Sequence, residues 1–376
     1  MALVCLHQMA PTEASEMRGL IDLSDSDRKS LSAAVARAKG IYRQGSSMHS
    51  IPTTKNTVLM TSCNSAYADF LSNWMCFANR HKLKFLFAPT DEAAARLLQP
   101  SAGPSLPACA RSALDGDAVT IYRPTNYTGS FKLSARDSVF GTKDFFAITK
   151  HKLQMVLCIL ELGTHVWFSD VDVVFIRDPW PAFRHEYECD YEHQMNKCDL
   201  SDPLHYTYPP GGATIGRHFT DANTGFHKLL SNERTKGLVQ KALALKGIDD
   251  QGALWKIILE LGVWWTPKHH NTSTGGTIKP ELFPSLQVAK THVGLSYFVS
   301  AIDPPPVEVV AAHAGHNFTW CPLLEVTHPD GRQPTPNTTD EQRIIFHANF
   351  RMGRTKKREL LRQKHLWLLD KTSRSS

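Results

Sequence analysis

The sequence predicts an α/β fold with a mixed, mostly parallel sheet flanked by helices. Short apolar, β-branched runs alternate with helical patterns through the first half of the chain, as βαβ units require. Such alternation favours a sheet that helices cover on both faces. Hydrophobic residues form 42% and charged residues 21% of the 376 residues, a composition that excludes wholesale disorder.

The first predicted elements alternate regularly. An apolar run at 58–61 predicts a strand, and Phe70, Trp74 and Phe77 recur at the spacing of a helix over 66–80. The series continues with a strand at 84–88, a short helix capped by Thr90 with Asp91 and Glu92 in its first turn, and a strand at 118–122.

The later elements are less regular. A long helix at 144–162 has one apolar side, and Gly163 stands where a left-handed C-cap is needed. Residues 186–224 are polar, and 263–340 are rich in Pro, Gly and Asn and give no assignment. The remaining expected elements are helices at 232–246 and 250–261, a strand at 344–347 and a basic C-terminal helix.

Two carboxylates, Asp170 and Asp172, fall between strand segments expected at 166–168 and 171–176. Ionised groups at a buried strand end are costly unless they are paired or bind a metal. Ligands bind at the carboxyl edge of open α/β sheets, so the pair predicts a site for Mn²⁺ or Mg²⁺ and a diphosphate. An acidic turn between two strands is the alternative interpretation.

Other candidate site residues lie far away in the sequence. His347 ends the last expected strand and could add a nitrogen ligand to the same metal, although a single histidine is more often structural. Gly353 permits close backbone approach and Lys356 supplies a charge for phosphate, or both belong to a solvated helix start. Asp250 and Gln251 begin a helix, where a capping box is the alternative to a functional role.

The charge pattern favours an anionic ligand and does not predict nucleic-acid binding. The formal net charge is +6, and the basic residues cluster only at 351–358 without a stripe of interleaved aromatic residues. No run of about twenty apolar residues occurs, so we expect no transmembrane segment in this chain. Residues 1–52 are polar and predict an N-terminal arm or stem before a single domain at 53–376.

Cysteines and glycosylation motifs bear on the compartment. The eight cysteines include no CxxC pair, which argues against a structural zinc site. Cys189 and Cys198 could close a disulfide loop, and Cys158 is expected to be a buried thiol. Four N-glycosylation motifs favour the Golgi or another secretory lumen, with the cytoplasm as the alternative; they begin at Asn126, Asn271, Asn317 and Asn337.

These stretches together carry a resemblance to a known family. The motifs are Trp167 to Val174 followed by Arg177-Asp178-Pro179, Asn223-Thr224-Gly225-Phe226, Asp250-Gln251, and His347-Ala348-Asn349 with Gly353. With them, residues 56–358 resemble the nucleotide-diphospho-sugar transferase domain of glycosyltransferase family 77. The resemblance implies a GT-A fold and a manganese-dependent enzyme that moves a sugar from a UDP-sugar to a glycan or glycoprotein hydroxyl with retention of configuration.

The resemblance also implies roles for individual residues. Asp170, Asp172 and His347 match the metal ligands, and Asp170 also matches the ribose and diphosphate motif. Asp250 and Gln251 match the catalytic segment beside the anomeric carbon. Residues that match donor-binding positions are Thr61, Lys152, Asn223 and Lys356. Five residues separate His347 from Gly353, more than in the glycogenin-like pattern, which leaves the phosphate contact of Lys356 open.

Two alternative functions remain. A sugar-phosphate nucleotidyltransferase also uses acidic residues and magnesium on an α/β sheet. It normally has a glycine-rich, basic loop after the first strand, whereas residues 61–65 contain no glycine and no basic residue. A catalytically inactive, carbohydrate-binding relative would keep the fold without the chemistry. The released product separates the three: the transferase releases UDP from a UDP-sugar, the nucleotidyltransferase releases pyrophosphate from UTP and a sugar phosphate, and the inactive relative releases neither.

Overall fold

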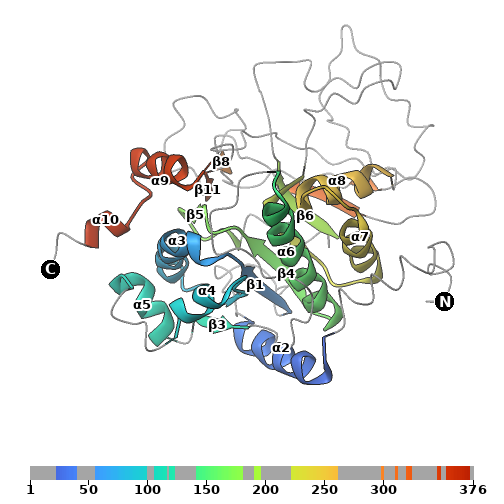
Figure 1. Cartoon of the computed structure of the whole chain (residues 1–376), viewed down its shortest axis with the longest axis horizontal. Helices are drawn as coiled ribbons and strands as arrows, with labels where there is room; N and C mark the ends of the chain where they lie inside the picture. Colours follow the sequence, from blue (N-terminus) through green and yellow to red (C-terminus); the bar gives the residue numbers. More distant parts are fainter. Residues whose placement is uncertain are drawn as a thin grey trace, which may run out of the picture.

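The fold is given by a computed structural model (Figure 1). An eight-stranded mixed sheet and a three-stranded antiparallel sheet organise the described part of the chain. The structure describes residues 23–39, 56–99, 106–116, 118–122, 141–180, 190–195, 222–260, 298–299, 310–311, 319–323, 345–348 and 353–372.

The large sheet has the strand order β3-β2-β1-β4-β7-β6-β10-β9. The first four strands in this order are parallel, as the βα alternation predicts, and β7 then runs antiparallel to both β4 and β6. The predicted mixed, mostly parallel sheet is confirmed. Its strands are β1 (Thr57–Thr61), β2 (Phe85–Phe87), β3 (Val119–Ile121), β4 (His165–Ser169), β6 (Tyr191–Met195), β7 (Ala222–Leu229), β9 (Val310–Ala311) and β10 (Thr319–Leu323).

The small sheet has the order β5-β11-β8, with bounds Val173–Phe175, Ile345–His347 and Phe298–Val299. Both of its pairings are antiparallel, and His347 lies opposite Val173. The chain therefore leaves the large sheet at Ser169, the end of β4, and enters the small sheet at Val173, with three residues between them. This change of sheet occurs at the acidic pair.

Helices cover both faces of the large sheet, and alternate strand residues separate the two layers of the core. Leu59 and Trp167 pack with α3 and α5, whereas Val58 and Phe168 pack with α2, α6, α7 and α8. The helices are α2 (Asp25–Ala38), α3 (Ala68–Arg80), α4 (Glu92–Leu97), α5 (Ala108–Asp115), α6 (Lys143–Glu161), α7 (Glu233–Ala244), α8 (Asp250–Glu260), α9 (Arg354–Gln363) and α10 (Leu369–Thr372), with a 3₁₀ turn η3 (Ser65–Tyr67).

Residues 25–38, which fall in the predicted polar arm, form the packed helix α2. Leu31 and Val35 are buried in the same core layer as α6, and the hydroxyl of Tyr122 donates to the carbonyl of Asp27. Asp25, Arg28, Lys29 and Arg37 are exposed and give the segment its polar composition, whereas Asp27 is buried. This part of the arm is therefore a packed element of the described fold.

Three local predictions have clear outcomes. Gly163 has φ +74, so the predicted left-handed C-cap of α6 is confirmed. The cap of α4 is Asp91 and not Thr90, because the Asp91 carboxylate accepts from Ala94 N. The sequence Asn223-Thr224-Gly225 is also typical of a turn, but residues 223–226 lie within strand β7, so the turn interpretation is wrong.

The structure contains a disulfide that the sequence analysis missed. Cys76 on α3 is bonded to Cys109 on α5, and both residues lie on the face that packs against Trp167. Cys158 is a free, buried thiol, as predicted. The predicted Cys189–Cys198 pair and the asparagines of the four glycosylation motifs lie outside the described residues. Among the described helices, none has both the length and the apolar character to cross a membrane.

Candidate metal centre

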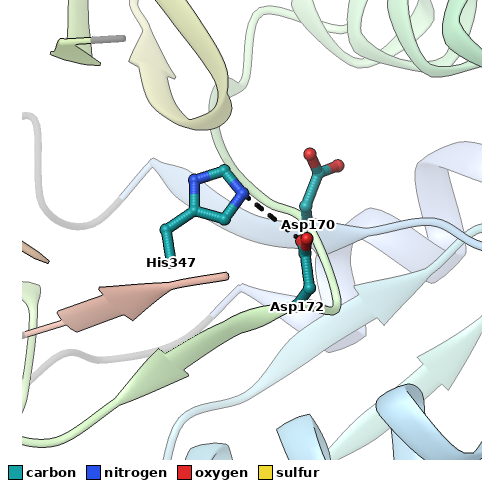
Figure 2. Close-up of side chains that lie close together, drawn as sticks. All are labelled: Asp170, Asp172 and His347. Atoms are coloured by element: carbon teal, nitrogen blue, oxygen red, sulfur yellow. Dashed lines mark ion pairs between the residues drawn. The ribbon is translucent and has the colours of Figure 1, made fainter. Parts of the chain in front are cut away.

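Three potential metal ligands meet where the two sheets join. Asp170 follows β4, Asp172 precedes β5, and His347 ends β11. Figure 2 shows these side chains close together, with His347 Nε2 3.4 Å from Asp172 Oδ1. One ligand atom from each of the three residues lies within 4.8 Å of the others. The structure thus brings together the three residues that the sequence predicts as ligands.

Backbone hydrogen bonds hold the acidic segment in place. Val173 N donates to Asp170 O (3.2 Å), which closes a tight turn between β4 and β5. Asp170 N donates to Gly225 O (2.7 Å), and Ala348 N donates to Asp172 O (3.1 Å). Locally the pair is therefore an acidic turn, as the alternative interpretation states. The turn nevertheless places both carboxylates against β7 and β11, where they meet His347.

The donor set and the space around it fit a divalent cation. Two carboxylates and one imidazole are ligands that Mn²⁺ accepts, and all three converge on one point. A Cβ at Gly225 would lie 2.4 Å from His347 Cε1 and 2.8 Å from Asp170 Oδ2. The absence of a side chain at this position is what allows the ligands to approach one another.

Lys152 connects Asp170 to the start of α8. Its Nζ lies 3.4 Å from Asp170 Oδ1 and 2.5 Å from Asp250 Oδ2. It also lies 4.7 Å from the centre of the Phe168 ring and donates to the carbonyl of Thr224 (3.3 Å). Burial lowers the pKa of Lys152, but the two carboxylates raise it by more, so its pKa lies above the ordinary value. The buried lysine is therefore charged, and it interacts with two carboxylates and one backbone carbonyl.

The start of α8 distinguishes between the two interpretations of its acidic residues. Gly252 N donates to Asp249 Oδ1 (2.7 Å), so Asp249 caps the first turn. Asp250 is 4% exposed and directs its carboxylate toward Lys152. The capping interpretation therefore does not account for Asp250. Gln251 is partly exposed at the same turn.

The two carboxylates of the turn have opposite electrostatic environments. Burial raises the pKa of Asp170, and Asp172 adds to that increase against the opposing effect of Lys152. Burial would also raise the pKa of Asp172, but Lys357 and His347 lower it well below its ordinary value. Asp172 is therefore ionised, with one oxygen facing Lys357 and the other facing His347.

The lysine that contacts the acidic turn is Lys357, a residue that sequence reasoning missed. Its Nζ donates to Asp172 Oδ2, whereas Lys356 is exposed on α9. The neighbouring basic residues anchor the helix, since Arg358 pairs with Asp69 and Arg354 donates to Ala66 O. The run of four basic residues in 354–358 indicates a basic helix, but only the rotation of α9 decides which lysine faces the turn.

The other predicted donor-binding residues are Thr61, at the carboxyl end of β1, and Asn223, at the start of β7. Thr61 ends β1, and its buried hydroxyl has no hydrogen-bond partner among the described residues. Asn223 is buried, and its Oδ1 accepts from Gly225 N (2.8 Å). An unsatisfied buried hydroxyl is costly, so Thr61 has the capacity to bind a polar ligand group.

Comparisons with known proteins agree with this geometry. Residues 114–303, half of the chain, match the family model described as nucleotide-diphospho-sugar transferase. The chain is 26% identical to the Arabidopsis thaliana beta-arabinofuranosyltransferase RAY1 over 54% of its own length and 34% of that protein. It is 27% identical to UDP-D-xylose:L-fucose alpha-1,3-D-xylosyltransferase 3 of the same plant, over 84% of this chain and 67% of that one.

The chain spans only about a third of the first of these relatives. Among solved structures, the apo-form glycosyltransferase GlyE of Streptococcus pneumoniae TIGR4 is 16% identical, with a TM-score of 0.28 over 54% of this chain and 43% of that one. The fold assignment rests on the sheet order and not on this likeness. Family membership rests on the match over half of the sequence. This chain belongs to the nucleotide-diphospho-sugar transferase family.

Proposed function

We propose that this protein is a metal-dependent glycosyltransferase that moves a sugar from a UDP-sugar to a hydroxyl of a glycan or glycoprotein, with retention of anomeric configuration. The observation that carries the proposal is the convergence of Asp170, Asp172 and His347 at the edge of the sheet. Family membership supplies the class of donor, a nucleotide-diphospho-sugar.

The three ligands would hold Mn²⁺ or Mg²⁺, which when bound would offset the negative charge of the diphosphate leaving group. Lys357 lies beside this position on helix α9. Its positively charged side chain is 22% exposed. We propose that Lys357 and Lys356 present ammonium groups to the departing diphosphate. Two cations at that point would stabilise the charge that develops as the sugar leaves.

The opposite side of the site would bind the sugar and the nucleoside. Lys152 fixes the carboxylate of Asp250 close to Asp170, which places negative charge beside the donor. We propose that Asp250 and Gln251 stabilise the positive charge that develops at the anomeric carbon, while the acceptor attacks from the side of the leaving group. Thr61 and Asn223 would contact the nucleoside part of the donor.

The names of the relatives suggest which donors to test first. One relative uses UDP-D-xylose and another transfers arabinofuranose, and both sugars are pentoses. We propose a UDP-pentose or UDP-hexose as donor. The Cys76–Cys109 disulfide favours an oxidising compartment, so we propose a Golgi or other secretory lumen as the site of action.

A donor panel tests the proposal. The purified chain is incubated with individual UDP-sugars and Mn²⁺, and the released UDP and pyrophosphate are measured with and without a chelator. We expect chelator-sensitive release of UDP from at least one donor. Release of pyrophosphate in a parallel incubation with UTP and sugar 1-phosphates would favour the nucleotidyltransferase, and binding of a sugar without any release would favour the inactive relative.

A further inference from the structure

We propose that Gly225 is a positioning residue that sets the spacing of the cation ligands, and that a single methyl group at this position abolishes tight cation binding while the fold persists. The inference rests on the proposed metal site but concerns a residue that would contact neither cation nor substrate. Gly225 lies in β7, and the three ligands come from the segments that surround this strand.

The space above Gly225 is filled by the ligands themselves. A Cβ there would meet His347 Cε1 at 2.4 Å, Asp170 Oδ2 at 2.8 Å and Asn223 Oδ1 at 2.9 Å. Carbon atoms in proteins pack at about 3.5–4.0 Å, so the first contact requires a displacement of more than about 1 Å. Two of the three atoms that would have to move belong to proposed cation ligands.

The backbone of Gly225 is held on both sides and does not have room to retreat. Its carbonyl accepts from Asp170 N (2.7 Å), and its N–H donates to Asn223 Oδ1 (2.8 Å). The next residue, Phe226, pairs with Ser169 of β4 and is fully buried in the core. Moving the strand would break the same hydrogen bond that positions Asp170.

The backbones of the ligands are held equally well. His347 pairs with Val173 in the small sheet, and Ala348 N donates to Asp172 O. The response to an added methyl group is therefore rotation of the His347 ring and of the Asp170 carboxylate about their side-chain bonds. Such rotation separates the ligand atoms while the strands and the core stay in place.

The test measures Mn²⁺ binding by the full chain without any donor or acceptor. Free Mn²⁺ is titrated by electron paramagnetic resonance in the wild type and in Gly225→Ala. We expect the variant to bind Mn²⁺ about 10–100-fold more weakly, the range typical of residues that orient metal ligands. An affinity within about twofold of wild type would overturn the inference, as would the absence of Mn²⁺ binding by the wild type.

The matched control is Gly237→Ala in α7. A Cβ at Gly237 meets no atom of the described residues within 4 Å, so the same substitution there adds a methyl group without a clash among them. We expect this control to bind Mn²⁺ like wild type and to unfold at an equal or higher temperature, because alanine is the better helix former. Equal weakening in both variants would contradict a specific role for Gly225.

A double-mutant cycle on metal-free protein keeps the inference testable if Gly225→Ala is poorly stable. Unfolding is followed in wild type, Gly225→Ala, His347→Ala and the double variant. Because the nearest clash is with the His347 ring, Gly225→Ala should lower the melting temperature less in the His347→Ala background. Equal effects in both backgrounds would overturn the steric explanation. UDP release is measured separately, so a chain that binds Mn²⁺ through these ligands but releases no UDP refutes the proposed function alone.

Discussion

The candidate site has two sides, one with a lysine between two carboxylates and one with a lysine paired to a single carboxylate, and the two lysines differ in how deeply they are buried. On the large-sheet side, Lys152 is 9% exposed and lies between Asp170 and Asp250. On the small-sheet side, Lys357 is 22% exposed and pairs with Asp172 from a surface helix. A buried cation between two carboxylates is part of the framework, whereas a partly exposed one can change partner at lower cost.

This difference suggests that one side of the site mainly maintains the structure and that the other mainly serves the reaction. The large-sheet side fixes the relative positions of β4, α6 and α8, which carry Asp170, Lys152 and Asp250. The small-sheet side depends on β5, β11 and α9, which carry Asp172, His347 and Lys357. We expect substitutions on the first side to affect stability and activity together, and substitutions on the second side to affect mainly activity.

The largest effect is expected for Asp172→Ala, which removes a ligand and leaves Lys357 without its carboxylate. Chelator-sensitive UDP release should fall by more than about 100-fold, since even residues that only orient a metal ligand contribute 10–100-fold. Asp144→Ala, at an exposed position in the first turn of α6, is the control and should keep wild-type activity. Full metal-dependent activity in Asp172→Ala would refute the assigned role.

Lys152→Met should cost the most stability. It leaves the carboxylates of Asp170 and Asp250 facing each other without a cation, and removing one partner of a buried pair costs about 3–5 kcal/mol. The free energy of unfolding is measured by urea denaturation, with UDP release in parallel. Lys150→Met on the same helix is the control, because within the described part of the chain Lys150 donates to the carbonyls of Leu243 and Leu245 and to no carboxylate. A loss no larger than in this control would contradict a framework role for Lys152.

Acid should weaken the large-sheet side first. Burial, together with the nearby Lys152, lowers the pKa of His227 to about 3. Between pH 6.5 and 3 the unfolded chain therefore binds a proton that the folded chain does not, and stability falls as the pH falls. From pH 6.5 to 5 this histidine contributes a loss of about 2 kcal/mol. His227→Gln should flatten the dependence of the unfolding free energy on pH by that amount, and an unchanged slope would contradict the buried, neutral state.

The smallest change in stability is expected on the small-sheet side. Lys357→Met should lower the unfolding free energy less than Lys152→Met does, because Lys357 is 22% exposed and contacts one carboxylate, whereas the more buried Lys152 contacts two. UDP release should nevertheless fall about 10-fold or more, as one charged hydrogen bond to the leaving group is lost. Lys356→Met is the matched comparison. If Lys356→Met lowers UDP release more than Lys357→Met does, the exposed lysine is the main diphosphate contact.

Much of the fold was predictable because it depends on local patterns. The alternation of apolar runs and helical spacing located β1, β2, β3 and β4 and the helices α3, α4 and α6, but it missed α5. The strands β6, β7, β9 and β10 were not predicted, because their segments are polar or rich in Pro and Gly. Their pairing depends on long-range partners such as β4, whose positions are absent from any local window.

The sequence by itself determined which residue types are available to the site: an acidic pair after a buried run, a histidine ending the last strand, and a basic helix beyond it. Local patterns carry this information because hydrophobic periodicity and caps act over a few residues. Only the tertiary structure decided that the pair bridges two sheets, that Lys152 lies between Asp170 and Asp250, and that Lys357 faces Asp172. It alone revealed the space above Gly225, because the side chains that form it come from segments as far apart in the sequence as Asp170 and His347.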